Sequence, residues 1–318
     1  MAERPCPSCR QQSYKAAYFF RDADGRFLKA LRLIECSACG LVYVSPLVRE
    51  KTLYFPHYYG RRRGLPSLIF EPFNRLWVRW KVRRLITLMP GRKLLDFGGG
   101  RGDFAKAMRE KDCEVWILEP QSDALSELRL SLGDHAVGSL DALRNDAGLF
   151  DAVTLWHVLE HLEDPVAVLS DLHRRVQPGG LLFLAVPNWA SMERRVFGDR
   201  WFHLDVPRHQ LHFTFESLRH LLDRTGWEVR SISYASWSYN GFGLFQSILN
   251  IGPGPRNLFY RVCKRGMSFN SGEPYFWAGL LWTICMTFPA MIITLSLIGF
   301  LTLTHRTGTL EVVAVKKG

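Results

Sequence analysis

The chain contains 318 residues, of which 47% are hydrophobic and 22% are charged, and its formal net charge is +11. This composition excludes a disordered or collagen-like chain and provides enough apolar material for a large core. The mean hydropathy of -0.05 argues against a polytopic membrane protein, and the positive charge favours an anionic neighbour such as a membrane surface, a nucleic acid or a phosphorylated substrate.

The first 45 residues contain four of the seven cysteines, arranged as two Cys-x-x-Cys pairs: Cys6 and Cys9, then Cys36 and Cys39. No apolar signal-peptide core begins the chain, so we expect a cytoplasmic protein with reduced thiols. Two such pairs supply the four thiolates that a tetrahedral zinc ion prefers, and they leave no open coordination position. Residues 1–45 are therefore predicted to form a zinc ribbon around a structural zinc, with short strands on either side of a turn at residues 22–25.

Residues 46–90 are predicted to form a proline-interrupted linker followed by a basic helix at residues 73–89. That helix contains two tryptophans and five basic residues, namely Trp77, Trp80, Arg75, Arg79, Lys81, Arg83 and Arg84. An amphipathic helix of this kind packs its aromatic side chains on a core and exposes its charges. Helices that lie on anionic lipid have the same pattern, so that interpretation stays open, as does contact with nucleic acid.

Residues 91–236 alternate between short buried strands and helices, which predicts an α/β fold with a doubly wound, Rossmann-like sheet. A strand at residues 93–97 leads into a glycine-rich turn at residues 98–102 and then into a helix. Glycines let a ligand approach the backbone, and the helix N-terminus faces that ligand. Glu119 ends the next strand, 21 positions after Gly98, where a carboxylate can hold a ribose diol. This combination predicts a site for a nucleoside-containing cofactor.

The order of these motifs resembles the class I S-adenosylmethionine-dependent methyltransferases that carry an N-terminal zinc ribbon. The matching segments are residues 94–102, 150–165, 177–188 and 207–218. The resemblance extends over nearly the whole chain and implies methyl transfer from S-adenosylmethionine. It assigns cofactor binding to Asp96, Gly98, Gly100, Gly102, Glu119, Leu140 and Asp141.

Methyl transfer to an oxygen acceptor needs a base that removes the acceptor proton, and histidine suits that role. The resemblance places His157 near the reacting methyl group, while His203, His209 and His212 follow in the segment on the substrate side. We take His157, His203 and His209 as the catalytic candidates. A structural role for any one of them stays open.

A divalent cation is a second way to assist the reaction. His157, Glu160 and His161 share one face if their segment is helical. The group resembles quinone O-methyltransferases, which place two glutamates and a histidine at these positions to hold a cation. Here His157 replaces the first glutamate, and nitrogen ligands suit softer ions than magnesium. We therefore favour a role for Glu160 and His161 in bracing the loop after the fourth strand.

Residues 237–307 are predicted to be a hydrophobic insertion, followed by the last strand of the core sheet in residues 308–318. Residues 274–304 contain no charged side chain and no histidine. Because the last strand belongs to the same sheet, the insertion has to return to the side of the membrane that it left. Two halves of about 14 helical residues reach ~21 Å each, which is shorter than the ~30 Å hydrocarbon core. We therefore predict a helical hairpin that bends near Pro289 and dips into one leaflet.

The favoured function is methyl transfer, preferably to oxygen, onto an amphipathic acceptor at the cytoplasmic membrane face. Such an acceptor is a lipid-linked sugar, a glycolipid or a quinone-like compound. The alternative is a soluble methyltransferase of a nucleotide sugar or small metabolite, with the insertion as a homodimer interface. A nucleic-acid-binding zinc-ribbon protein belongs to another class. The basic residues are too scattered to favour it, so we expect no nucleic-acid partner. A cofactor-binding scaffold without catalysis also stays open.

Overall fold

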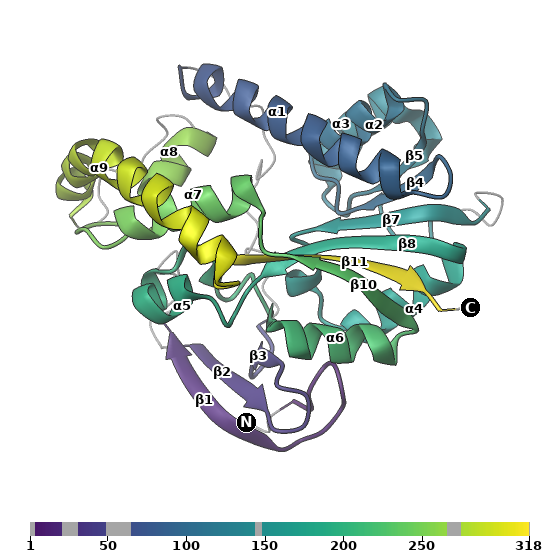
Figure 1. The fold of residues 1–318 in the computed structure, drawn as a ribbon, viewed down its shortest axis with the longest axis horizontal. Coiled ribbons are helices and arrows are strands. Elements are labelled where there is room, and N and C mark those ends of the chain that lie inside the picture. The colour runs from purple at the N-terminus through teal and green to yellow at the C-terminus, as the bar shows by residue number, and fades with distance from the viewer. Residues whose placement is uncertain (1–3, 21–30, 49–64, 144–147, 266–274, 318) are drawn as a thin grey trace.

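The computed structural model describes residues 4–20, 31–48, 65–143, 148–265 and 275–317 (Figure 1). Its main element is a seven-stranded sheet with the order β10-β11-β8-β7-β4-β5-β6. The strands are β4 (Lys93–Phe97), β5 (Glu114–Leu118), β6 (Ala136–Val137), β7 (Phe150–Trp156), β8 (Val176–Pro187), β10 (Trp227–Ser233) and β11 (Thr309–Lys316). The strands from β4 to β8 run parallel, and β11 is antiparallel to both of its neighbours. The predicted Rossmann-like α/β architecture is confirmed.

Helices cover both faces of this sheet, which explains why its strands are continuous apolar runs. One face packs against α1 (Leu65–Leu88), α2 (Asp103–Arg109) and α3 (Ser122–Leu132). The other face packs against α4 (Pro165–Arg175) and α6 (Phe215–Arg224). Trp227 anchors the second layer, because its buried indole Nε1 donates a hydrogen bond to the backbone oxygen of Leu169 at 3.2 Å.

The N-terminal segment forms a smaller antiparallel sheet, to which the Rossmann-like part of the chain contributes one short strand. Its strands are β1 (Tyr14–Phe20), β2 (Leu31–Cys36) and β3 (Val42–Val44), and β9 (Leu211–His212) completes it at the edge of β3. The predicted turn at residues 22–25 and most of the predicted linker lie outside the described residues. The pairing of β3 with β9 fixes the N-terminal segment to the histidine-rich part of the chain.

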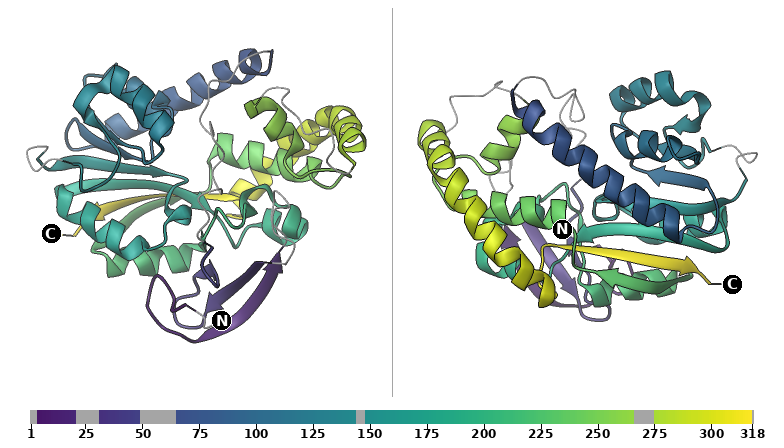
Figure 2. Two further views of the ribbon diagram at one scale, coloured as in Figure 1. Left: turned by 180° about the vertical axis from the view of Figure 1, so that it is seen from behind. Right: turned by 45° about the horizontal axis from the view of Figure 1, so that its top comes forward.

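The structure of the hydrophobic insertion differs from the prediction. The predicted helical hairpin with a bend at Pro289 is wrong. The insertion consists of α7 (Trp237–Leu249), α8 (Leu258–Arg265) and α9 (Phe276–Leu303), and α9 is one helix of 28 residues with Pro289 inside it. A proline in a helix removes one backbone hydrogen bond, and neighbouring packing offsets that cost here. The partner of α9 is α7, so α9 does not have to fold back on itself. The helix α7 lies between α9 and the sheet, and α8 lies beside α9 and contacts α1 (Figures 1 and 2).

Glu193, in α5 (Met192–Phe197), anchors the point where α9 rejoins the sheet. Its side chain is 1% exposed, and Oε1 accepts a hydrogen bond from the backbone nitrogen of Gly308 at 2.9 Å. Burial raises the pKa of this carboxyl to about 8, although the bond from Gly308 opposes the shift. Glu193 is therefore protonated in the folded chain near neutral pH.

We expect Glu193 to make the protein less stable as the pH rises. Between about pH 4.5 and 8 the folded chain holds this proton and the unfolded chain does not, so the free energy of unfolding falls with increasing pH. Glu193→Gln keeps the acceptor for Gly308 and removes the titration. In urea unfolding at pH 5, 6.5 and 8, the free energy of unfolding of this variant should rise relative to that of the wild type by a few kcal/mol at pH 8. The exposed Glu127→Gln is the control, and an equal pH dependence of all three proteins would refute the assignment.

Candidate active site

The carboxyl ends of β4 and β7 form the point where the strand order reverses. Open α/β sheets bind their ligands at such a point. Near the end of β4, Asp96 is 1% exposed and accepts a hydrogen bond from Thr154 Oγ1 of β7 at 2.7 Å. Burial raises the pKa of Asp96 to about 6, and the hydroxyl of Thr154 counteracts this shift. Asp96 is thus a buried acidic group at the position where a ligand is expected.

The glycine turn follows Asp96 and is closed by Glu119. Gly98, Gly100 and Gly102 all have positive φ angles, of 74°, 57° and 72°, which L side chains adopt only with strain. Oε2 of Glu119 accepts from the backbone nitrogen of Gly100 at 2.9 Å, and Oε1 accepts from the backbone nitrogen of Gln121 at 3.0 Å. The structure therefore brings the predicted acid and the glycine turn together.

The last two residues that the resemblance assigns to cofactor binding, Leu140 and Asp141, are placed differently from each other. Leu140 is half-buried against the core, whereas the side chain of Asp141 is exposed. Both follow β6, the strand next to β5, at the same end of the sheet as Glu119. The predicted cofactor residues thus come from successive strand ends.

The catalytic candidate His157 follows β7 directly and has an unusual backbone. Its φ of 54° lies in the left-handed region, which costs energy for a residue other than glycine and is found most often at functional sites. His157 Nδ1 lies 3.1 Å from Oε1 of Glu160, which belongs to the short helix η4 (Leu159–His161). The buried Nε2 of His157 has no hydrogen-bond partner among the described residues. The ring packs against Tyr239, with a centroid distance of 4.0 Å.

The other two catalytic candidates lie beside this pair. The rings of His203 and His157 stack at 5.7 Å, and His209 Nδ1 lies 2.8 Å from the backbone oxygen of His203. His209 Nε2 is 3.9 Å from Glu160 Oε1, which is too far for a hydrogen bond. Burial lowers the pKa of His203 to about 3 and that of His209 to about 4, so both are neutral at pH 7.

Glu160 is the ionised centre of this histidine group. Its side chain is completely buried, which by itself raises the pKa of a carboxyl. The hydrogen bond with His157 and the positive charges of nearby histidines, when protonated, more than offset burial and lower the pKa of Glu160 to about 2. Because His209 is neutral at pH 7, its positive charge is absent there, and the hydrogen bond with His157 is the largest of the contributions that lower the pKa of Glu160. A buried carboxylate paired with one imidazole is an arrangement suited to general base chemistry.

The cation triad of His157, Glu160 and His161, which the sequence did not favour, is not assembled in the structure. The backbone at His157 prevents one helical face, and the cluster that brings ligand atoms within 4.8 Å of one another contains Glu160, His161 and His209. Glu160 also braces the loop through its backbone oxygen, which accepts from the backbone nitrogen of Gln210 at 2.8 Å.

The four cysteines of the N-terminal pairs meet as predicted. Their sulfur atoms lie within 4.8 Å of one another, with 3.6 Å between Cys6 and Cys39 and 3.4 Å between Cys9 and Cys36. A zinc ion with sulfur ligands at ~2.3 Å needs sulfur–sulfur separations of about 3.8 Å in a tetrahedron. The cluster is therefore compatible with zinc.

Sequence reasoning missed Lys81, which it grouped with the solvated charges of the basic helix. Lys81 is 2% exposed and lies among Trp77, Trp156 and Tyr239. The helical spacing contained a signal, because Lys81 falls three residues after Val78 and four before Leu85, on the buried stripe of α1.

We expect the buried histidines to make the protein sensitive to mild acid. Burial lowers the pKa of His212 to about 3, so unfolding takes up a proton below about pH 6.5 and stability falls as the pH decreases toward 3. His212→Phe removes this proton uptake and should reduce the slope of unfolding free energy against pH, measured by urea titration from pH 6.5 to 4.5, by about 1.4 kcal/mol per pH unit. The exposed His220→Phe should keep the wild-type slope, and an unchanged slope in His212→Phe would contradict the assignment.

Comparison with known proteins identifies relatives of this chain. Over 133 residues the chain is 33% identical to a ubiquinone biosynthesis O-methyltransferase from Thiobacillus denitrificans, which covers 39% of this chain and 56% of the relative. A protein of the same name from Pseudomonas aeruginosa is 32% identical over 129 residues, covering 37% and 55%. The chain thus spans about half the length of the curated relatives it matches.

Among solved structures, an S-adenosylmethionine-dependent methyltransferase from Archaeoglobus fulgidus superposes with a TM-score of 0.46 and 19% identity, covering 80% of this chain and all of the other. The family model described as a methyltransferase domain matches residues 69–232, which is more than half of the chain. The match begins in α1 and ends in β10, and it includes the glycine turn and His157. The chain belongs to this methyltransferase family.

Proposed function

We propose that this protein transfers a methyl group from S-adenosylmethionine to a hydroxyl oxygen of an amphipathic acceptor at the cytoplasmic face of a membrane. The observation that carries the proposal is the His157–Glu160 pair immediately beyond β7, beside the ligand-binding end of the sheet. The relatives named ubiquinone biosynthesis O-methyltransferase support an oxygen acceptor on a quinone-like compound. A lipid-linked sugar or glycolipid is the second candidate acceptor.

The cofactor residues follow the strand ends in order. Asp96 would meet the methionine ammonium, and the backbone of the glycine turn (Gly98, Gly100 and Gly102) would pass close to the cofactor. Glu119 would bind the ribose with the lone pairs that its two backbone hydrogen bonds leave available. Leu140 and Asp141 would lie on either side of the adenine. Bound S-adenosylmethionine supplies an electrophilic methyl group on a sulfonium.

His157 would act as the base in this reaction. With Glu160 ionised, the Nδ1 proton of His157 points to Oε1 of Glu160, which leaves the Nε2 lone pair to accept the acceptor proton. As the acceptor oxygen attacks the methyl group, the electron pair of the carbon–sulfur bond stays on sulfur. The proton moves to Nε2, and Glu160 stabilises the imidazolium that results. His203 and His209 would position the acceptor from the neighbouring wall.

The cysteine cluster would hold a structural zinc that keeps β3 in place. Because Val42 and Tyr43 of β3 pair with His212 and Leu211 of β9, the zinc would hold the histidine segment against the core. Four thiolates leave no coordination position for a substrate, so the zinc takes no part in the chemistry.

We expect His157→Gln to abolish most of the activity without loss of the cofactor. Methyl-labelled S-adenosylmethionine is incubated with a lipid and metabolite extract of native cells, and labelled products are identified by mass spectrometry. Removing a general base should lower the rate of label transfer by roughly 10²- to 10⁴-fold while S-adenosylmethionine still binds. Glu160→Gln should have a smaller effect in the same direction.

His220→Gln, at an exposed position, is the matched control for this experiment. Wild-type activity in His157→Gln would exclude His157 as the base. Cofactor binding by the wild type without any labelled product would favour a non-catalytic scaffold. A water-soluble product, such as a methylated nucleotide sugar, would exclude the amphipathic acceptor.

The surface of α9 supports the membrane part of the proposal. Large apolar side chains that are more than 60% exposed recur along this helix at Trp277, Leu281, Ile284, Phe288, Leu295 and Leu303. Patches of this kind on a soluble protein mark a binding surface. Arg306, just beyond the helix, is exposed and suits anionic headgroups, whereas Arg256 at the other end is paired with Asp199 at 2.5 Å.

The packing of α9 favours an in-plane position over a transmembrane one. By length and composition α9 is the single described helix able to cross a bilayer, since 28 residues extend about 42 Å. One side of it, however, packs on α7, and its C-terminal end is held by β11 of the core sheet. A helix held in this way would lie along the surface with its free side among the acyl chains.

We expect three lysines on the free side of α9 to prevent membrane binding. The variant Leu281→Lys, Phe288→Lys, Leu295→Lys changes positions spaced by seven residues, all exposed, so the fold should be retained. Co-sedimentation with phosphatidylglycerol vesicles should fall at least about tenfold relative to the wild type. The control Leu130→Lys lies on α3, where Leu130 is 90% exposed, and should bind like the wild type. If the wild type stays in the supernatant, membrane binding by α9 is contradicted. If it forms a dimer that the triple variant disrupts, the exposed side of α9 is a protein interface and not a membrane-binding surface.

A further inference from the structure

Lys81 is a buried basic residue that has no counter-ion among the described residues. Its Nζ lies 3.4 Å from the ring centroid of Trp77 and 3.6 Å from that of Trp156, and its hydrogen bond to the hydroxyl of Tyr239 is long at 3.4 Å. Among the described residues, no carboxylate oxygen lies within 4.0 Å of this nitrogen. A buried ammonium needs an anionic partner to offset the loss of water, and two indole faces replace that partner only in part.

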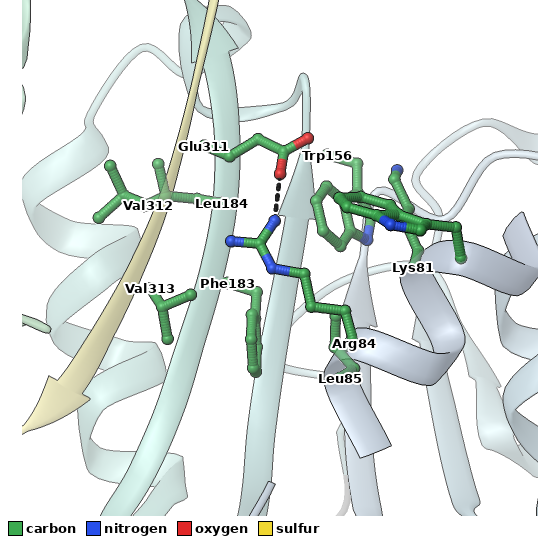
Figure 3. Close-up of a pocket in the computed structure, with 10 residues that line it drawn as sticks. Lys81, Arg84, Leu85, Trp156, Phe183, Leu184, Glu311, Val312 and Val313 are labelled. Carbon is green, nitrogen blue, oxygen red and sulfur yellow. Dashed lines mark hydrogen bonds and ion pairs between the residues drawn. The ribbon is translucent and has the colours of Figure 1, made fainter. Parts of the chain in front are cut away.

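The two carboxylates whose charges act on Lys81, Glu311 and Asp96, are already engaged by other groups. Glu311 of β11 forms an ion pair with Arg84 at 2.5 Å, and Figure 3 shows the Arg84 side chain reaching across to it while Lys81 lies beside Trp156. Asp96 accepts the hydrogen bond from Thr154. Burial lowers the pKa of Lys81 well below its usual value, and the more distant charges of Glu311 and Asp96 oppose that shift only partly. The fold therefore holds a buried lysine amine that lacks an anionic partner among the described residues.

The position of Lys81 indicates which anion this is. Trp156, which Lys81 contacts, is the last residue of β7, and Asp96 lies near the end of the neighbouring β4. Lys81 and Asp96 are thus two buried, opposite charges at the ligand-binding end of the sheet that do not pair with each other. A ligand that carries both an ammonium and a carboxylate group would offer each of them a partner. The amino-acid end of S-adenosylmethionine is such a zwitterion.

We propose that Lys81 binds the carboxylate of the methionine part of S-adenosylmethionine, opposite Asp96, which binds its ammonium. The inference rests on the proposed function, since it needs this cofactor. An anionic group on the acceptor is the other possible source of a carboxylate, and the experiment separates the two.

The test is isothermal titration of the full chain with three ligands: S-adenosylmethionine, decarboxylated S-adenosylmethionine and methylthioadenosine. Lys81→Met keeps the length of the side chain and removes its charge. It should weaken S-adenosylmethionine binding roughly 10- to 100-fold, as expected for the loss of a charged hydrogen bond. Decarboxylated S-adenosylmethionine should bind the wild type and the variant equally, because it lacks the group that Lys81 contacts. Methylthioadenosine, which lacks the amino-acid end, should also bind both equally and shows that the variant is folded.

Arg79→Met is the matched control, because Arg79 is an exposed basic residue of the same helix, and it should leave all three affinities unchanged. The proposal is overturned if Lys81→Met binds S-adenosylmethionine within twofold of the wild type, or if it weakens the decarboxylated ligand just as much. Unchanged cofactor binding with a loss of label transfer would assign the anion to the acceptor instead. A wild type that binds none of the three ligands would refute the proposed function itself, whereas equal binding by wild type and variant refutes only the role of Lys81.

Discussion

The buried carboxylate of Glu160 is the constraint on which the substrate side of this protein depends. A fully buried negative charge is stable only if the surrounding groups compensate for it. His157 supplies the hydrogen bond, and the backbone of Glu160 is tied to Gln210, whose own backbone oxygen accepts from Val44 of β3. The N-terminal sheet, the histidine segment and the strained end of β7 are thus connected through one residue. A change in any of these three elements therefore alters the environment of the same charge.

The sequence could predict the parts of this arrangement that are local. The Cys-x-x-Cys pairs, the strand–glycine–helix order and the acid at Glu119 each depend on neighbouring residues, and the structure contains all of them. The meeting of His157 with His203 depends on how distant segments pack, and only a family resemblance placed both near one site. The burial of Lys81 is a further example of this limit. The helical spacing of α1 places Lys81 on the buried stripe with Val78 and Leu85, whereas its charge alone favours an exposed position.

The hydrophobic insertion shows why a composition pattern does not define a tertiary arrangement. The structure contains both the uncharged run and its return to the sheet, whereas Pro289 had indicated a run that folds back on itself. In the structure α7 provides the antiparallel partner instead. Close contact at Gly279, where an added Cβ would lie 2.7 Å from the backbone oxygen of Pro253, keeps α9 near the segment that follows α7. Sequence alone could not choose between these two partners, because both bury the same apolar residues.

The helix α7 links the apolar surface to the histidine group. One side of α7 packs on α9. At Gly243 an added Cβ would lie 2.3 Å from Nε2 of His203, so the absence of a side chain at Gly243 allows α7 to approach the ring of His203 closely. Tyr239, two residues after the start of the insertion, contacts both the ring of His157 and the amine of Lys81. A single helix therefore separates the surface proposed to meet lipid from the groups proposed to act on the acceptor. An acceptor whose apolar part stays in the bilayer would need to extend its hydroxyl group only past this helix, which is the geometric reason for favouring an amphipathic substrate over a water-soluble one.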